Sequence, residues 1–253
     1  VEIVAGKDFY SLLNRKADKK ILLDMLNPVS GERWNETVTP ISTGTENELL
    51  YQRWVKNCIK ETEKLSNGRV GYIHVKGMNS ESFREVYSEL LGRNVNKEAI
   101  IIDTRFNGGG WLHDDLATLL SGKRYVDFVP RGQYVGSEPI SKWSKPSIVI
   151  MGEGNYSDAH AFPYTYKALN IGKLVGMPVP GTMTAVWWET QQDPTLVFGI
   201  PQIGVKDLKG NYLENQQTEP DIKVSISPED AANGIDTQLK AAVDEMLKQL
   251  DSQ

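Results

Sequence analysis

The polar turn after the apolar run Ser147–Met151 contains the residue best suited to nucleophilic chemistry. This run has the length of a buried strand, and it leads through Gly152–Tyr156 to Ser157 and Asp158, where a helix should begin. A serine hydroxyl at such a position lies beside backbone amides able to stabilise the negative oxygen of an acyl-transfer intermediate. The alternative is that Ser157 or Asp158 only caps the helix.

Three consecutive glycines follow a second apolar run and suit the binding of an anionic group. The segment Ile101–Gly110 reads Ile-Ile-Asp-Thr-Arg-Phe-Asn-Gly-Gly-Gly, a strand that enters a loop. Because glycine lacks a Cβ atom, the N–H groups of Gly108, Gly109 and Gly110 can approach a ligand closely. The loop is therefore a candidate oxyanion hole, and the alternative is a tight turn without a ligand.

A carboxylate in the turn-rich segment Tyr212–Ile222 is the third candidate. Glu214 precedes Asn215, after the last predicted strands. A carboxylate at this place can orient an imidazole or a side chain that contacts one. The alternative is a solvated loop glutamate.

The elements that must position these residues alternate between strands and helices. Helical segments are expected at Ser80–Leu91 and Asp114–Leu120, and a C-terminal helix at Thr237–Leu250. Short apolar runs that predict strands are Val70–Val75, Ala99–Thr104, Ser147–Met151 and Lys173–Gly176, and further strands are expected at Thr184–Thr190, Thr195–Ile200 and Gln202–Lys206. This alternation predicts an α/β domain with a largely parallel sheet.

The first 45 residues form too small a set of elements for an independent core. A short helix is expected at Asp8–Leu13, a strand at Lys20–Leu26 and its hairpin partner at Thr37–Ile41. A long helix at Glu46–Leu65 then leads into the main domain. We interpret the N-terminal segment as the end of another domain.

Composition excludes several classes of function. The 253 residues carry a net charge of −5 without a basic cluster, so nucleic acid is not an expected partner. No apolar run approaches the ~18–20 residues that span a bilayer. The single cysteine, Cys58, excludes an internal disulfide and a cysteine-rich metal site. Val1–Phe9 lacks the features of a signal peptide, so we expect a processed product or a piece of a longer protein.

The order of the motifs resembles the tricorn-type and C-terminal processing peptidases. The matching segments are Gly-Tyr-Ile-His at Gly71–His74, Asp-x-Arg-Phe-Asn-Gly-Gly-Gly at Asp103–Gly110, Tyr-Ser-Asp at Tyr156–Asp158, and Glu-Asn…Pro-Asp-Ile at Glu214–Ile222. This resemblance implies a ClpP/crotonase-like spiral core with crossover helices over residues 46–253, with residues 1–45 as the C-terminal remnant of a PDZ-like domain.

The resemblance also implies a role for each candidate residue. Ser157 would be the nucleophile of a serine peptidase, with the Asp158 N–H and the N–H of Gly109 or Gly110 as oxyanion-hole donors. Glu214 would hydrogen-bond the partner that orients the general base. The implied substrate is a peptide or an unfolded protein, with no cofactor and no metal.

The expected general base has no counterpart in this sequence. In the family a Ser-His pair upstream of a PDZ domain supplies it, so we expect the base N-terminal to Val1 and the isolated chain to be nearly inactive. His74 is expected within the sheet, and His160 lies on the same predicted helix as Ser157, with its ring directed away from the hydroxyl. His113 precedes Asp114-Asp115, and three neighbours in sequence make a poor set of metal ligands. We therefore expect His113 to lie at a solvated helix start.

Two other classes of function remain open at this stage. One is a catalytically inactive module that binds extended peptides on the same fold. The other is an acyl-CoA hydratase type of enzyme, which has a similar spiral fold and little use for the Tyr-Ser-Asp segment. The sequence is compatible with a homo-oligomer. It does not fix a compartment: we expect a periplasmic or secreted protein if it is bacterial and a cytoplasmic one if it is archaeal.

Overall fold

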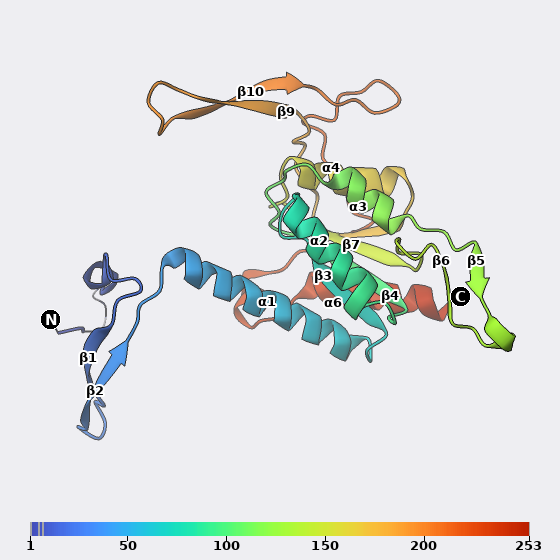
Figure 1. Cartoon of the computed structure of the whole chain (residues 1–253). Helices are drawn as coiled ribbons and strands as arrows, with labels where there is room; N and C mark the ends of the chain where they lie inside the picture. Colours follow the sequence, from blue (N-terminus) through green and yellow to red (C-terminus); the bar gives the residue numbers. More distant parts are fainter. Residues whose placement is uncertain (1, 5, 7, 253) are drawn as a thin grey trace. The chain divides into compact units, whose positions relative to one another are not determined.

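The structure is a computed structural model that describes residues 2–4, 6 and 8–252, and it divides into two compact units (Figure 1). The first unit spans Val1–Asn57 and the second spans Cys58–Gln253. The long helix α1 (Thr43–Leu65) begins in the first unit and ends in the second. Its start is capped by Ser42, whose Oγ accepts a hydrogen bond from the N–H of Thr45 at 3.1 Å.

The first unit contains a single antiparallel hairpin and a short 3-10 helix. The helix is η1 (Tyr10–Leu13), and strand β1 (Ile21–Leu26) pairs with β2 (Arg33–Val38). The partner strand therefore begins four residues earlier than predicted, because Asn27 closes the turn by accepting hydrogen bonds from two following amides. None of the described residues of this unit is buried. Its relation to a PDZ domain stays a prediction.

A five-stranded parallel sheet forms the centre of the second unit. In spatial order its strands are β11 (Ile222–Lys223), β8 (Lys173–Gly176), β7 (Ser147–Met151), β4 (Ala99–Asp103) and β3 (Val70–His74). Every residue of β3, β4 and β7 is buried. Parallel strands covered on both faces need such continuous apolar runs. The predicted α/β class with a mostly parallel sheet is confirmed.

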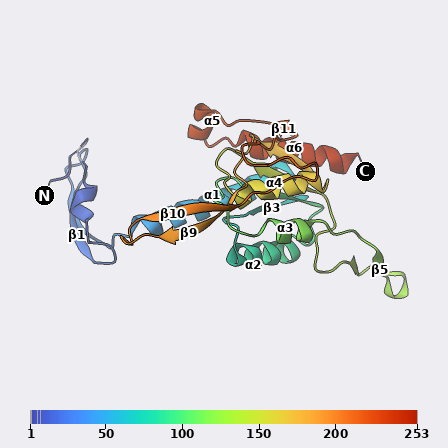
Figure 2. The same ribbon diagram turned by 90° about the horizontal axis from the view of Figure 1, so that it is seen from above.

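Helices cover both faces of this sheet (Figures 1 and 2). They are α2 (Ser80–Ser88) with the π-turn η2 (Glu89–Arg93), α3 (His113–Leu120), α4 (Asp158–Ala168) and α6 (Thr237–Asp251), whereas the short helix α5 (Pro228–Ala232) has no buried residue. Ile102 and Val149 pack with Val86, Leu116 and Phe162 of α2, α3 and α4 in one apolar cluster. Side chains alternate along a strand, so the neighbouring positions of β4 and β7 face the opposite side, where α6 packs.

Two antiparallel hairpins extend from the sheet. One joins β9 (Ala185–Thr190) to β10 (Val197–Ile203), with an irregularity between Pro201 and Ile203. The sequence predicted two separate strands where β10 is continuous, because the irregularity interrupts the apolar alternation. The other hairpin, β5 (Val126–Phe128) and β6 (Gly136–Glu138), was not predicted; it is short and its strands have no buried residue.

A buried ion pair connects the sheet to the start of α6. Arg105 Nη2 lies 2.6 Å from Asp103 Oδ2 at the end of β4 and 2.8 Å from Asp236 Oδ2 at the N-cap of α6. Tyr72 donates its hydroxyl to Asp103 at 2.8 Å. Burial raises the pKa of Asp103, but the adjacent Arg105 outweighs it and the pKa of the carboxyl is lowered. This network fixes the strand end from which the glycine loop departs.

Candidate active site

Ser157 occupies a strained position at the junction between a loop and α4. Its backbone has φ 54° and ψ −120°, a conformation that a residue with a side chain rarely adopts. The preceding loop is held by Asn155, which is buried and donates to Thr104 Oγ1 at 2.8 Å and to the carbonyl of Ala159 at 3.1 Å. The turn is therefore rigid on the side that faces the sheet.

The glycine loop after β4 lies directly against this turn. Asn107 is fully buried, accepts a hydrogen bond from the Tyr156 N–H at 3.0 Å and donates to the carbonyl of Val75 at 2.8 Å. Gly109 has φ +95°, and a Cβ there would lie 2.6 Å from the Tyr156 carbonyl oxygen and 2.8 Å from the Ser157 Cβ. Only glycine permits this approach, which brings the loop next to the Ser157 turn.

Backbone amides from both loops are available beside the hydroxyl. The Gly109 N–H already donates to Asn107 Oδ1 at 2.9 Å. Among the described residues, the N–H groups of Gly110 and Asp158 have no acceptor. A Cβ on Gly109 would lie 3.1 Å from the Asp158 nitrogen, so the two loops meet at this amide. The N-terminus of α4 adds a positive partial charge at the same point.

The carboxylate of Asp158 joins the two loops a second time. Its Oδ2 accepts hydrogen bonds from the N–H groups of Leu112 at 2.5 Å and His113 at 3.0 Å, and its Oδ1 lies 2.5 Å from the His113 Nδ1. Asp158 thus caps α3 from another element. The hydrogen bond to Asp158 raises the pKa of His113 against the opposing effect of burial. The expected solvated helix start is wrong, because His113 is half-buried and paired.

Thr182, in the loop before β9, supports the backbone of the nucleophile. Its Oγ1 accepts a hydrogen bond from the Ser157 N–H at 2.9 Å, and its own N–H donates to His160 Nδ1 at 3.1 Å. His160 must then be protonated on Nε2, which lies 3.0 Å from Thr218 Oγ1. Burial lowers the pKa of His160, so the ring is neutral and structural. No sequence motif marks Thr182, and sequence reasoning missed it.

His74 and Glu214 also make backbone contacts. His74 Nε2 lies 2.9 Å from the Arg105 carbonyl oxygen, and burial lowers its pKa. Glu214 Oε2 accepts hydrogen bonds from the amides of Met183 at 2.8 Å and Thr184 at 2.7 Å. Burial raises the pKa of Glu214, but hydrogen bonds from the Thr184 side chain and from the Thr184 and Met183 amides outweigh it and the pKa is lowered. The carboxylate therefore fixes the loop that carries Thr182.

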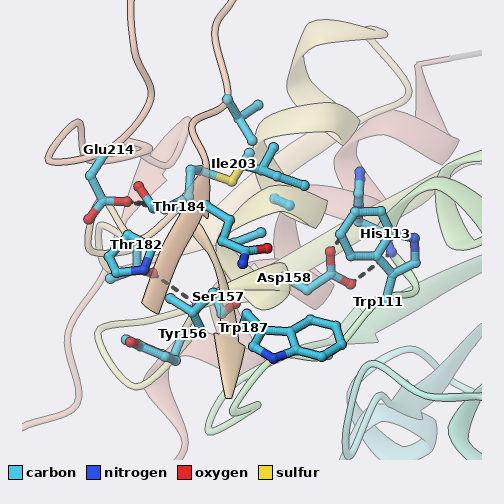
Figure 3. Close-up of a pocket in the computed structure, with 18 of the residues that line it drawn as sticks. Trp111, His113, Tyr156, Ser157, Asp158, Thr182, Thr184, Trp187, Ile203 and Glu214 are labelled. Atoms are coloured by element: carbon cyan, nitrogen blue, oxygen red, sulfur yellow. Dashed lines mark hydrogen bonds and ion pairs between the residues drawn. The ribbon is translucent and has the colours of Figure 1, made fainter. Parts of the chain in front are cut away.

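One cavity of about 900 Å³ brings most of the predicted site residues together (Figure 3). Its lining includes Ser157, Asp158, Gly110 and Glu214, whereas Gly109 is not among the lining residues. Aromatic and aliphatic side chains of the β9–β10 hairpin, of the loop before β9 and of the segment after the glycine loop cover the rest: Trp111, Met183, Val186, Trp187, Trp188 and Ile203. Within the described part of the chain, no cluster of three or more metal-ligating side chains occurs.

The serine turn and the glycine loop meet at one edge of the parallel sheet, and this arrangement is that of a known family of peptidases. Residues 69–224 match the model of peptidase family S41, and this match covers more than half of the chain. The chain belongs to this family. None of its described helices combines the length and the apolar character needed to cross a bilayer.

Within this family, the chain is similar to tricorn-type enzymes. The tricorn protease homolog of Saccharolobus solfataricus is 30% identical over 97% of this chain and 23% of the relative. The tricorn protease of Thermoplasma volcanium is 27% identical over 99% of this chain and 24% of the relative. A crystal structure of the tricorn protease superposes with a TM-score of 0.82 at 24% identity, over 98% of this chain and 24% of that chain. The predicted family and fold are confirmed, and the chain spans about a quarter of these relatives.

Proposed function

We propose that this chain carries the nucleophile and oxyanion hole of a serine peptidase that hydrolyses peptide bonds through an acyl-enzyme at Ser157. The observation that carries the proposal is the strained Ser157 turn, which opens onto a cavity beside the Asp158 and Gly110 amides, two donors from separate loops that have no acceptor among the described residues. Enzymes for acyl transfer need this combination, because the nucleophile and the donors must address one tetrahedral carbon. Membership of peptidase family S41 supports the same chemistry.

The reaction follows from the positions of these groups. The Ser157 oxygen attacks the carbonyl carbon of a peptide bond while a base removes the hydroxyl proton. The resulting oxyanion accepts hydrogen bonds from Asp158 N–H and from Gly110 N–H, since the N–H of Gly109 is already engaged by Asn107. Collapse releases the amine, which takes the proton, and water then hydrolyses the ester by the reverse sequence.

The general base of this proposal comes from outside the chain. His160 accepts a backbone hydrogen bond on Nδ1 and is kept neutral by burial. The ring of His74 faces a backbone carbonyl, and that of His113 faces Asp158. A histidine from an upstream segment of the complete polypeptide would therefore complete the site. Glu214, which already holds the loop before β9, would hydrogen-bond the partner of that histidine.

A fluorophosphonate probe tests the assignment of the nucleophile. The complete polypeptide is incubated with the probe, digested and mapped by mass spectrometry, with Ser157→Ala as the control variant. We expect the phosphonyl group on Ser157 and no labelling of the variant. The chain alone should be labelled far more slowly, because a serine without its base is a weak nucleophile at neutral pH. Modification of another residue, with Ser157 unmodified, contradicts the proposal.

The second candidate function is a peptide-binding module without catalysis. Strands β9 and β10 pair only with each other among the described strands, so both outer edges can accept an extended peptide. The exposed side chains of Trp187, Trp188 and Phe198 add apolar surface beside them. If the complete polypeptide bound peptides without cleaving them, and Ser157→Ala behaved as the wild type, this function would replace the peptidase.

A further inference from the structure

Three donors converge on the carboxylate of Asp158. Two are the backbone N–H groups of Leu112 and His113, and the third is the His113 ring nitrogen Nδ1, 2.5 Å from Oδ1. The Asp158 side chain is only 5% exposed, so water is a poor substitute for a missing donor. The orientation of this carboxylate therefore depends on the His113 ring.

The same contact joins the two arms of the proposed oxyanion hole. One arm is the N–H of Asp158 itself, and the other is the N–H of Gly110, two residues before Leu112. When Asp158 holds Leu112 and His113, it fixes the exit of the glycine loop relative to the start of α4. A shift of either arm would lengthen the hydrogen bond that it offers to an oxyanion, and such bonds act only at short distance.

We propose that His113 is a positioning residue that aligns the oxyanion hole through Asp158. This inference rests on the proposed function at Ser157. In Figure 3 Asp158 lies between Ser157 and His113, so the ring acts on the hole through the carboxylate and not on the hydroxyl. The ring also lies edge-on to Trp111, with 6.2 Å between centroids, which limits its rotation. The raised pKa of His113 agrees with a firmly held contact to Asp158.

The test compares substitutions that differ in where they place a donor. In His113→Asn the side-chain amide can occupy the position of Nδ1, whereas in His113→Gln it reaches the position of Nε2 and not the carboxylate. His113→Ala removes the donor. Asp115→Asn is the matched control, since this exposed aspartate lies in the same turn and affects His113 only through its charge, which is the weakest of the effects on the pKa of that ring. All variants are made in the complete polypeptide.

Kinetics with a fluorogenic peptide separate positioning from substrate binding. A directly lost oxyanion donor typically lowers kcat by about 100-fold or more, and an indirect misalignment should lower it by about tenfold in His113→Ala and His113→Gln. We expect KM to stay within about twofold, because the hole contributes mainly in the transition state. His113→Asn should recover most of kcat, and Asp115→Asn should match the wild type. A peptidyl trifluoromethyl ketone places its hemiketal oxygen in the hole. Its inhibition constant should therefore rise by about the same factor by which kcat falls.

The outcomes distinguish this inference from the proposed function. If the wild type is not labelled at Ser157 by a fluorophosphonate, the proposed function fails and the inference with it. If the wild type is labelled and active, but His113→Gln retains full kcat, only the role of His113 is overturned. Equal losses in His113→Asn and His113→Gln also overturn it. In an Asp158→Asn background His113→Gln should have little further effect, and an undiminished additional loss would show that the ring acts by another route.

Discussion

The hydrogen bond from the Ser157 N–H to Thr182 Oγ1 is the most accessible test of how the nucleophile is held. Thr182→Val keeps the shape of the side chain and replaces the accepting oxygen with a methyl group. The Ser157 N–H, which donates at 2.9 Å in the structure, is then left without a partner. Thr182→Ser is the matched control, since it retains the oxygen and removes only the methyl group.

The expected magnitude follows from the strain in the turn and from the cost of leaving its N–H without an acceptor. A residue held at φ 54° and ψ −120° stores strain of about 1–3 kcal/mol, which the surrounding contacts must balance. An unsatisfied backbone donor costs about 1–3 kcal/mol, and the half-buried position of Ser157 favours the lower part of that range, about 1.4 kcal/mol. We therefore expect Thr182→Val to reduce the unfolding free energy by this amount and the population of the reactive turn by about tenfold.

Two measurements check this expectation. Urea unfolding of the chain, followed by circular dichroism, gives the change in unfolding free energy. The second-order rate constant of fluorophosphonate labelling at Ser157, measured in the complete polypeptide, reports the reactive turn and should fall by about tenfold. Thr182→Ser should stay near the wild type in both. The reasoning is refuted if Thr182→Val labels as fast as Thr182→Ser, because the contact would then not hold the turn.

Three further predictions concern stability. Gly110→Ala places a Cβ 1.9 Å from the Met78 carbonyl oxygen and should lower the free energy of urea unfolding by about 1–3 kcal/mol. A Cβ on Gly108 has no atom within 4 Å, so Gly108→Ala should lower this free energy far less. Burial lowers the pKa of His160 below its unfolded value of 6.5, so the contribution of this residue to stability should be full above that pH and be lost as the pH falls below it, as measured by unfolding at each pH. Asp103→Asn removes one of the two carboxylates that pair with the buried Arg105 guanidinium. It should lower the unfolding free energy by about 3 kcal/mol, as measured by thermal or urea unfolding.

Each of these predictions has a contradicting result. Equal stability of Gly110→Ala and Gly108→Ala would show that the close approach at Met78 is not required. A stability that does not fall as the pH drops below 6.5 would mean that His160 takes up a proton as readily in the folded state as in the unfolded state. A wild-type melting temperature in Asp103→Asn would mean that the ion pair is replaceable by a neutral hydrogen bond.

The central sheet and the line-up of Ser157 with the glycine loop could be predicted from the sequence. Ala99–Thr104 and Ser147–Met151 are continuous apolar runs, and only strands covered on both faces need them. Their carboxyl ends meet at one edge of a parallel sheet, so the residues that follow them must approach each other. The β9–β10 and β5–β6 hairpins were less predictable, because exposed strands carry weak alternation.

Local sequence therefore determined which residues could do chemistry, since strand length, glycine content and turn residues act over a few positions. Only the tertiary structure decided which distant side chains hydrogen-bond these residues and hold them in place. Thr182 reaches the Ser157 amide across 25 positions, and Asp158 reaches His113 across 45. These contacts depend on the packing of whole elements, which brings one carboxylate and one hydroxyl within hydrogen-bond distance. Within the described part of the chain, the same packing leaves the Gly110 amide without an acceptor while the adjacent Gly109 amide donates to Asn107.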